Sequence, residues 1–305
     1  MTSRPTDFHE SAMRRLRRRM GWRIRDTWPD RKVVRTVQGV PMTLPWSHRL
    51  PDYTGGDSPY GQNLVALADL LHDGGEPVVV LDIGANVGDS AVQIAHATDA
   101  EVVCVEGDPY YLEFLTANTG GDERFHLEAS LLVPDTNAAP VRPIRGRGTT
   151  RFATSHTTGS AATITPAQLR DRHPCTERLR LVKSDTDGYD VCLVPAIARH
   201  WHDRKPVLFF EYDLRLSRLA GFDPLLVWHE LAALGYREVA AWGNGGHPLW
   251  RSDVGSMPRL SAILDAPKGR YEPIYWDVAV VHHEDTVAAE AIASLVPEIR
   301  APEQA

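Results

Sequence analysis

The sequence predicts an α/β protein built around a parallel sheet, and three observations lead to this prediction. Short apolar segments alternate with segments whose apolar residues recur at helical spacing. A glycine-spaced turn follows the first strand of this alternation. Clusters of acidic and small polar residues follow the later strands, as expected where parallel strands end at a ligand-binding edge.

The alternation can be followed along the chain. Residues 31–45 alternate apolar and polar side chains around a Gly and a Pro, which is typical of a hairpin, and residues 61–75 show helical spacing before a Gly-Gly stop. Further strands are expected over residues 78–83, 101–106, 125–133, 179–185, 206–213, 236–242 and 273–283, with helices over 89–98, 109–119, 189–201 and 223–235.

We accordingly divide the chain into four parts. A basic arm over residues 1–36 precedes a hairpin and helix, over residues 37–76, that pack on the core. The α/β domain spans residues 77–290, and a tail covers residues 291–305. Within the domain, residues 132–162 are rich in Pro, Gly, Ser, Thr and Arg without a regular period, so we expect an insertion that leaves the sheet.

The N-terminal arm carries the strongest charge asymmetry. The chain has a net charge of −7, whereas residues 1–36 contain eleven Lys or Arg against four Asp or Glu. Such an arm can bind nucleic acid, an anionic membrane surface or an acidic protein. The alternative is a solvated helix that docks through Leu16, Met20, Trp22 and Ile24. The acidic remainder of the chain argues against a long track for nucleic acid.

The composition is that of an ordinary globular protein, with 43% hydrophobic and 24% charged residues. No stretch approaches the length of a membrane-spanning helix, and the first residues lack the apolar core of a secretion signal, so we expect a cytoplasmic protein. Cys104, Cys175 and Cys192 are odd in number and unclustered, which argues against disulfides or a cysteine-rich zinc site.

The turn after the first strand, VLDIGANVGDS at residues 80–90, is not a dinucleotide fingerprint. Gly84 and Gly88 are present, but Asn86 and Asp89 stand where that fingerprint requires glycine. A carboxylate at Asp89, in the first turn of the following helix, also disfavours a pyrophosphate there. The turn therefore favours a ligand that carries positive charge and lacks phosphate.

S-adenosylmethionine meets these requirements, because it has an ammonium, a carboxylate, a sulfonium, a ribose and no phosphate. We expect Asp82 to contact the ammonium, the Gly84–Gly88 backbone to lie against the amino-acid end, and Asn86 to donate to its carboxylate. Glu106 ends the next strand, where a carboxylate can accept hydrogen bonds from the ribose diol. The alternative is that the glycines only turn the chain and Glu106 is a surface acid.

Further candidates follow the later strands. Ala129 and Ser130 are suited to an adenine edge, or are ordinary strand residues. Asp185 and Asp187 can raise each other's pKa, and one of them can accept a proton from a hydroxyl during methyl transfer. The competing interpretation is that these aspartates cap the helix that follows.

The last strands supply other options. Asp185 with Glu211 or Asp213 could hold Mg²⁺, since this ion prefers oxygen ligands, or Glu211 could form a wall of the substrate pocket. His247, in a glycine-rich loop, is an alternative base or a solvated side chain. In the insertion, four arginines could clamp an anionic substrate or remain solvated: Arg142, Arg145, Arg147 and Arg151.

Four segments together resemble the FkbM family of S-adenosylmethionine-dependent methyltransferases: VVVLDIGANVGDSAVQIA, VEGDP, LVKSDTDGYD and PVLFFEYD. The resemblance covers roughly residues 36–283. The positions that match the family pattern are Asp82, Gly84, Asn86, Gly88, Glu106, Asp108, Pro109, Lys183, Asp185, Asp187, Gly188, Asp190 and Glu211. Gly107 replaces the usual proline, and Asp187 and Asp190 replace glutamates.

The resemblance implies a class I, Rossmann-like methyltransferase sheet of about seven strands, mostly parallel with an antiparallel last strand and helices on both faces. It also places Gly107, Asp108 and the neighbouring Glu106 at the cofactor. It implies O-methylation of a hydroxyl on a small sugar, glycan or secondary metabolite. Two alternatives stay open: a methyltransferase for nucleic acid or protein recruited by the basic arm, and a non-catalytic cofactor-binding protein. A homodimer is also an open alternative.

Overall fold

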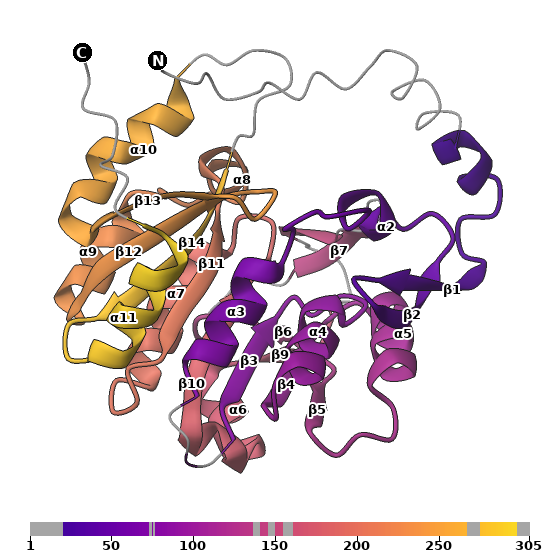
Figure 1. Cartoon of the computed structure of the whole chain (residues 1–305), viewed down its shortest axis with the longest axis horizontal. Helices are drawn as coiled ribbons and strands as arrows, with labels where there is room; N and C mark the ends of the chain where they lie inside the picture. The colour runs from indigo at the N-terminus through magenta and orange to yellow at the C-terminus, as the bar shows by residue number, and fades with distance from the viewer. Residues whose placement is uncertain are drawn as a thin grey trace.

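The computed structural model describes residues 21–72, 75, 77–136, 141–145, 150–154, 161–266 and 275–297, with the backbone alone for the two short segments at 141–145 and 150–154 (Figure 1). Its centre is an eight-stranded sheet of order β13-β12-β14-β11-β10-β3-β4-β5. The strands are β3 (Val79–Ile83), β4 (Glu101–Val105), β5 (Phe125–Glu128), β10 (Leu179–Ser184), β11 (Val207–Tyr212), β12 (Tyr236–Gly243), β13 (Pro248–Asp253) and β14 (Trp276–His282).

The strand directions confirm a mostly parallel sheet with an antiparallel late strand. Strands β5, β4, β3, β10 and β11 pair in parallel, and β14 lies antiparallel between β11 and β12. The sheet has eight strands instead of the expected seven or so, and the additional strand is β13. The glycine-rich loop after β12 is the turn of a hairpin, and β13 pairs antiparallel with β12 at the sheet edge.

Helices cover both faces, as predicted, because the buried strands alternate their apolar side chains between two cores. One core is formed with α6 (Pro166–Arg172), α7 (Asp190–His200), α9 (Leu226–Ala233) and α10 (Met257–Asp265). The other is formed with α3 (Gln62–Leu70), α4 (Asp89–Ala97) and α11 (Thr286–Leu295). Figure 1 shows α3 and α11 in front of the sheet.

The predicted N-terminal hairpin is present as β1 (Lys32–Val37) and β2 (Val40–Pro45). With α2 (Leu50–Tyr53) it packs on α4 and on α5 (Pro109–Thr119), through a small third core that includes Met42, Leu44 and Phe114. This packing brings residues 48–65 over the ends of the central strands. The N-terminal segment therefore forms one side of the functional site.

Several elements were not predicted. The segment expected as one strand over residues 125–133 divides into β5 and β6 (Leu131–Leu132), which pairs instead with β9 (Thr163–Ile164). The insertion contains a hairpin, β7 (Val141–Arg145) and β8 (Thr150–Thr154). Helix α8 (Leu214–Leu219) begins at a cap from Asp213, and α11 extends across the expected tail boundary. Within the described part of the chain, every helix is too short or too polar to span a lipid bilayer.

Only residues 21–36 of the basic arm lie within the described ranges, so Leu16 and Met20 lie outside them. Trp22 anchors this part, because its indole nitrogen donates to Asp52 at 2.8 Å and the guanidinium of Arg49 lies 4.4 Å from its ring centre. Ile24 is 59% exposed and does not dock. The expected docking is therefore seen at Trp22 and not at Ile24.

Candidate functional site

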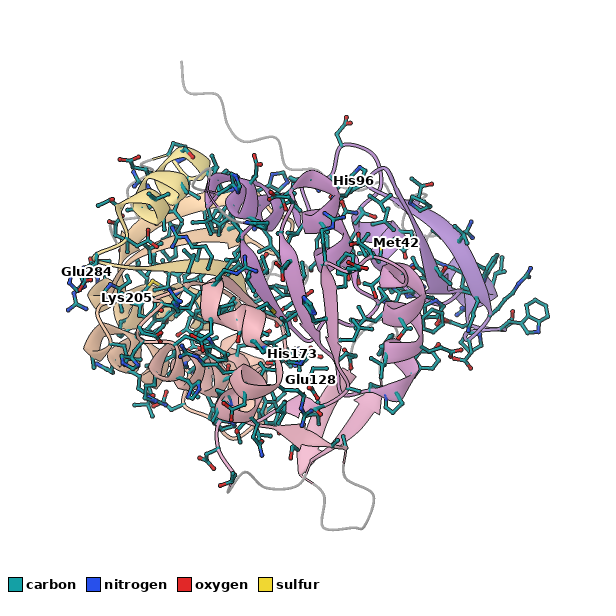
Figure 2. All side chains as sticks on the ribbon, turned by 90° about the horizontal axis from the view of Figure 1, so that it is seen from below. Met42, His96, Glu128, His173, Lys205 and Glu284 are labelled. Atoms are coloured by element: carbon teal, nitrogen blue, oxygen red, sulfur yellow. The ribbon has the colours of Figure 1, made fainter. Side chains whose placement is uncertain are left out.

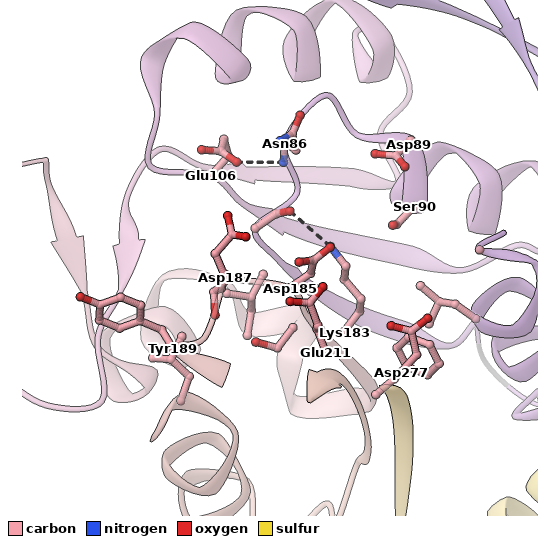
Figure 3. A pocket seen from close by; sticks show the side chains of 18 of the residues that line it. Asn86, Asp89, Ser90, Glu106, Lys183, Asp185, Asp187, Tyr189, Glu211 and Asp277 are labelled. Carbon is pink, nitrogen blue, oxygen red and sulfur yellow. Dashed lines mark hydrogen bonds between the residues drawn. The ribbon is translucent and has the colours of Figure 1, made fainter. Parts of the chain in front are cut away.

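A cavity of about 460 Å³ lies beyond the carboxyl ends of the central parallel strands, where ligands bind in open α/β sheets. The turn after β3, the end of β4 and the end of β10 form one part of its wall, and β11 and β14 form another. Residues from α2, α3 and the segment between them close it from the N-terminal side. Figure 3 shows the acidic side chains of these elements converging on the cavity.

The turn after β3 has an unusual backbone. Gly84, Asn86 and Gly88 all have positive φ angles, of 73°, 52° and 85°. A Cβ on Gly84 would lie 2.1 Å from the carbonyl oxygen of Asp185, so only glycine permits the close approach of this turn to β10. Gly84 and Asn86 line the cavity, whereas Gly88 packs against Leu115 of α5 and does not line it.

Glu106 is fixed at the cavity wall by two backbone groups. Its carboxylate accepts a hydrogen bond from the backbone N–H of Asn86 at 2.8 Å (Figure 3) and another from the backbone N–H of Asp108 at 2.7 Å. Burial raises the pKa of Glu106 to about 7, although both hydrogen bonds lower it. Each carboxylate oxygen has a second lone pair, which leaves the group able to accept from ligand hydroxyls.

Asp82 does not reach the cavity. It is completely buried, and the ammonium of Lys183 lies 3.0 Å from its carboxylate, between Asp82 and the cavity. This contact is an ion pair without hydrogen-bond geometry, because neither Asp82 oxygen accepts a hydrogen bond from the described residues. Lys183 also donates to the carbonyl oxygen of Gly84 at 3.2 Å. The expected direct contact of Asp82 with a ligand ammonium is therefore replaced by a contact with Lys183.

The three aspartates after β10 have different environments. Asp190 is fully buried and accepts hydrogen bonds from Ser184 at 2.6 Å and from the backbone of Thr186 at 3.1 Å, so it holds the turn together. Asp187 lines the cavity with a φ of 52°, and Asp185 is exposed to it. Helix α7 begins after Tyr189 without a side-chain cap, so the competing interpretation of these aspartates as helix caps is not supported.

The ends of β11 and β14 bring two further carboxyl groups to the cavity, Glu211 and Asp277. Burial raises the pKa of Asp277 to about 8 and that of Glu211 well above its ordinary value, and Asp185 raises both further. Asp213 does not join them, because it is buried and caps α8 by accepting from Leu216 N–H at 2.8 Å.

The arrangement does not favour the Mg²⁺ alternative. Among the described residues, the groups that bring three potential ligand atoms within 4.8 Å of one another lie elsewhere, and none includes Asp185, Glu211 or Asp277. Because Asp213 is engaged as a helix cap, only the combination of Asp185 with Glu211 remains of the two that were considered.

Several predicted residues lie outside the cavity. Asp108 is buried and caps α5 by accepting from Tyr110 N–H at 3.0 Å, and Ala129 is exposed. His247 is exposed in the β12–β13 turn and does not line the cavity. Gly107 and Ser130 do line the cavity.

The glutamate at the end of β5 is engaged elsewhere. Glu128 accepts from Arg172 at 2.8 Å and lies beside His173, 3.3 Å away (Figure 2). Of the insertion's arginines, Arg147 lies outside the described residues, and the side chains of Arg142, Arg145 and Arg151 are not described either.

The N-terminal segment supplies cavity residues that sequence reasoning missed. His48 accepts from the backbone N–H of Leu50 through Nδ1, so its Nε2–H donates to the side chain of Asn86 at 3.3 Å. Burial lowers the pKa of His48 to about 4, so this imidazole is neutral. Tyr60 and Tyr275 line the opposite part of the cavity. None of these three residues lies in a turn that follows a predicted parallel strand, so the sequence gives no local signal for them.

Comparison with known proteins gives weak similarities. No family model matches the chain. No curated protein matches it. Among solved structures, a putative O-methyltransferase from Klebsiella pneumoniae is 13% identical with a TM-score of 0.40, over 73% of this chain and 79% of that one. P. horikoshii TYW2 in complex with MeSAdo is 12% identical with a TM-score of 0.40, over 82% and 70%. The N-methyltransferase NodS from Bradyrhizobium japonicum is 12% identical with a TM-score of 0.39, over 74% and 97%. These values are too low to bear on activity or substrate.

Proposed function

We propose that this protein is an S-adenosylmethionine-dependent methyltransferase. The observation that carries the proposal is the Glu106–Asn86 contact, which joins the end of β4 to the positive-φ turn after β3 at one wall of the cavity. The turn presents backbone to an amino-acid end, and Glu106 presents free lone pairs to a ribose diol. The motif pattern shared with the FkbM family supports the same assignment.

The charge of the cavity fits this cofactor. The described lining contains six carboxyl groups, from Asp89, Glu106, Asp185, Asp187, Glu211 and Asp277, against the cationic side chains of Lys183 and Arg49. Burial raises the pKa of Asp89 to about 6, and a pyrophosphate would meet this acid at the start of α4. A ligand with a sulfonium and an ammonium is attracted to such a wall, whereas a dinucleotide is repelled.

We propose a hydroxyl as the methyl acceptor. The cofactor supplies an electrophilic methyl group. The protein orients the acceptor oxygen and provides Asp185, with Asp187 close by, to accept the hydroxyl proton at a carboxylate oxygen. Lys183 stays paired with Asp82 and keeps positive charge behind the turn rather than acting as a base.

Isothermal titration with S-adenosylhomocysteine, NADH and ATP tests the cofactor class. We expect S-adenosylhomocysteine to bind and the two phosphate-bearing ligands to show no binding, because Asp89 stands at the phosphate position. Binding of NADH or ATP without S-adenosylhomocysteine would refute the proposal. The acceptor atom is tested separately, by supplying ¹³C-methyl cofactor and identifying an O–CH₃ rather than an N–CH₃ product by NMR.

A further inference from the structure

Glu211 and Asp277 form a carboxyl pair at the β11–β14 end of the cavity. They are directly opposite each other in the antiparallel register of these two strands, so their side chains project from the same face of the sheet. Both line the cavity, and Figure 3 shows them on the side away from Asn86 and Glu106. Two ionised carboxylates in opposite positions destabilise a strand pair, so this placement gives the fold no benefit, and burial with the neighbouring carboxylates raises the pKa of both groups.

The cations of the described cavity wall are already engaged. Lys183 lies 3.0 Å from Asp82, and Arg49 lies 3.3 Å from Asp26. Both aspartates are outside the cavity lining, so the two positive charges are balanced from behind the wall. The carboxyl groups that face the cavity therefore exceed the positive charge available to them there.

Glu211 has the least satisfied carboxyl group of the pair. Its Oε1 is buried and has no hydrogen-bond partner among the described residues. A buried carboxyl oxygen without a donor is costly, and such atoms in a cavity indicate the position of a ligand donor. The side chain of Asn63 lies near Asp277 and lowers its pKa against the larger effect of burial, but the Nδ2 of Asn63 also has no hydrogen-bond partner among the described residues.

Aromatic side chains line the cavity together with the pair. Phe209, Tyr60 and Tyr275 line the same cavity, and Phe209 is supported from behind by Trp242, with ring centres 5.9 Å apart. Aromatic faces attract organic cations, and carboxylates attract them more strongly.

We infer that the acceptor is an amino alcohol, whose ammonium group binds between Glu211 and Asp277 while its hydroxyl faces Asp185. This inference rests on the proposed function, because the cofactor must occupy the part of the cavity beside Gly84 and Glu106. The carboxyl pair then lies in the part left for the acceptor, one and two strands beyond Asp185.

A matched pair of small probes tests the inference. Benzylamine and benzyl alcohol have nearly the same shape and differ in charge, and both fit an aromatic-walled pocket. Their dissociation constants are measured by ligand-observed NMR on the full chain saturated with S-adenosylhomocysteine. The variants are Asp277→Asn and Glu211→Gln, with exposed Asp171→Asn as the matched control. Unchanged binding of S-adenosylhomocysteine shows that each variant is folded.

We expect benzylamine to bind about tenfold or more tightly than benzyl alcohol, a difference of about 1.4 kcal/mol. Each cavity variant should reduce that preference to about threefold or less, and the control should keep it. Equal affinities, a preference that persists in both cavity variants, or no benzylamine binding at millimolar concentration would overturn the inference. If the wild-type chain does not bind S-adenosylhomocysteine, that result would instead refute the proposed cofactor.

Discussion

The ammonium nitrogen of Lys183 lies 3.0 Å from a carboxylate oxygen of Asp82 and 3.2 Å from the carbonyl oxygen of Gly84. Lys183 and Asp82 are register partners on the neighbouring strands β10 and β3. Burial lowers the pKa of Lys183, but the carboxylates of Asp82, Asp185 and Asp89 raise it by more, so the side chain stays charged. One buried cation thus ties the two central strands to the turn that shapes the cavity.

Replacing this cation should destabilise the fold. Lys183→Met leaves Asp82 buried without its partner, and we expect a loss of about 3 to 5 kcal/mol in the free energy of unfolding, measured by urea denaturation. The matched control is Lys205→Met, which removes the exposed ion pair with Glu284 seen at the surface in Figure 2 and should leave the free energy of unfolding nearly unchanged. Equal losses in the two variants would contradict the structural role of Lys183.

Glu106 should control cofactor affinity. Glu106→Gln keeps the shape of the side chain, but it removes the charge that strengthens hydrogen bonds to a diol and puts an amide NH₂ where one of the two oxygens accepts from a backbone N–H. We expect the dissociation constant for S-adenosylhomocysteine to rise about 10- to 100-fold by calorimetry, as for loss of a charged hydrogen-bond partner. Exposed Glu123→Gln serves as the control and should leave the constant unchanged. An unaltered affinity in Glu106→Gln would remove this residue from the cofactor site.

Stability of the ligand-free protein should depend on the proton carried by Asp277. Burial, reinforced by Asp185 and opposed by Lys183 and Asn63, raises its pKa from 3.8 to about 8. Because the folded state binds this proton more tightly than the unfolded chain does, the contribution is complete below 3.8 and is lost as the pH rises to about 8.

The Asp277→Asn variant cannot lose that proton. Its free energy of unfolding should therefore rise relative to wild type as the pH is increased through this window, in urea titrations at several pH values. Asp171→Asn, at an exposed position, should follow the wild-type curve. Parallel curves for wild type and Asp277→Asn would show that Asp277 does not titrate in this range.

Gly84 should tolerate no side chain. Gly84→Ala combines a positive φ with a Cβ that would meet the backbone oxygen of Asp185 at 2.1 Å, and we expect a loss of about 3 kcal/mol or more. Gly121 has a φ of 86° and open space around its Cβ position, so Gly121→Ala should cost only about 1 kcal/mol. Thermal or urea unfolding measures both. Similar losses would mean that the approach of the turn to β10 is not restrictive.

Local sequence patterns predicted much of the fold and one half of the site. The strand, the turn at Gly84 and Glu106 at the next strand end are near one another in sequence, so periodicity and glycine spacing were sufficient to place them. Asp82 was expected to face a ligand, because the sequence alone does not show that Lys183 on a distant strand reaches it.

The other half of the site depends on tertiary packing. His48 and Tyr60 enter the cavity because the N-terminal hairpin packs on α4 and α5. Asp277 lies within a mostly apolar segment, so the sequence alone does not mark it as a site residue. Its pairing opposite Glu211 places it at the cavity. For His247, the structure agrees with the alternative of a solvated side chain, because its turn packs through Gly246 against Pro59 and leaves the imidazole exposed.

A crystal structure of the full chain with S-adenosylhomocysteine tests the central claim most directly. We expect the ribose hydroxyls within hydrogen-bond distance of the Glu106 carboxylate and the amino-acid end against the Gly84–Gly88 turn. The part of the cavity beside Glu211 and Asp277 should remain open to an acceptor. Density for the ligand at another site, or a ribose that does not contact Glu106, would contradict this account.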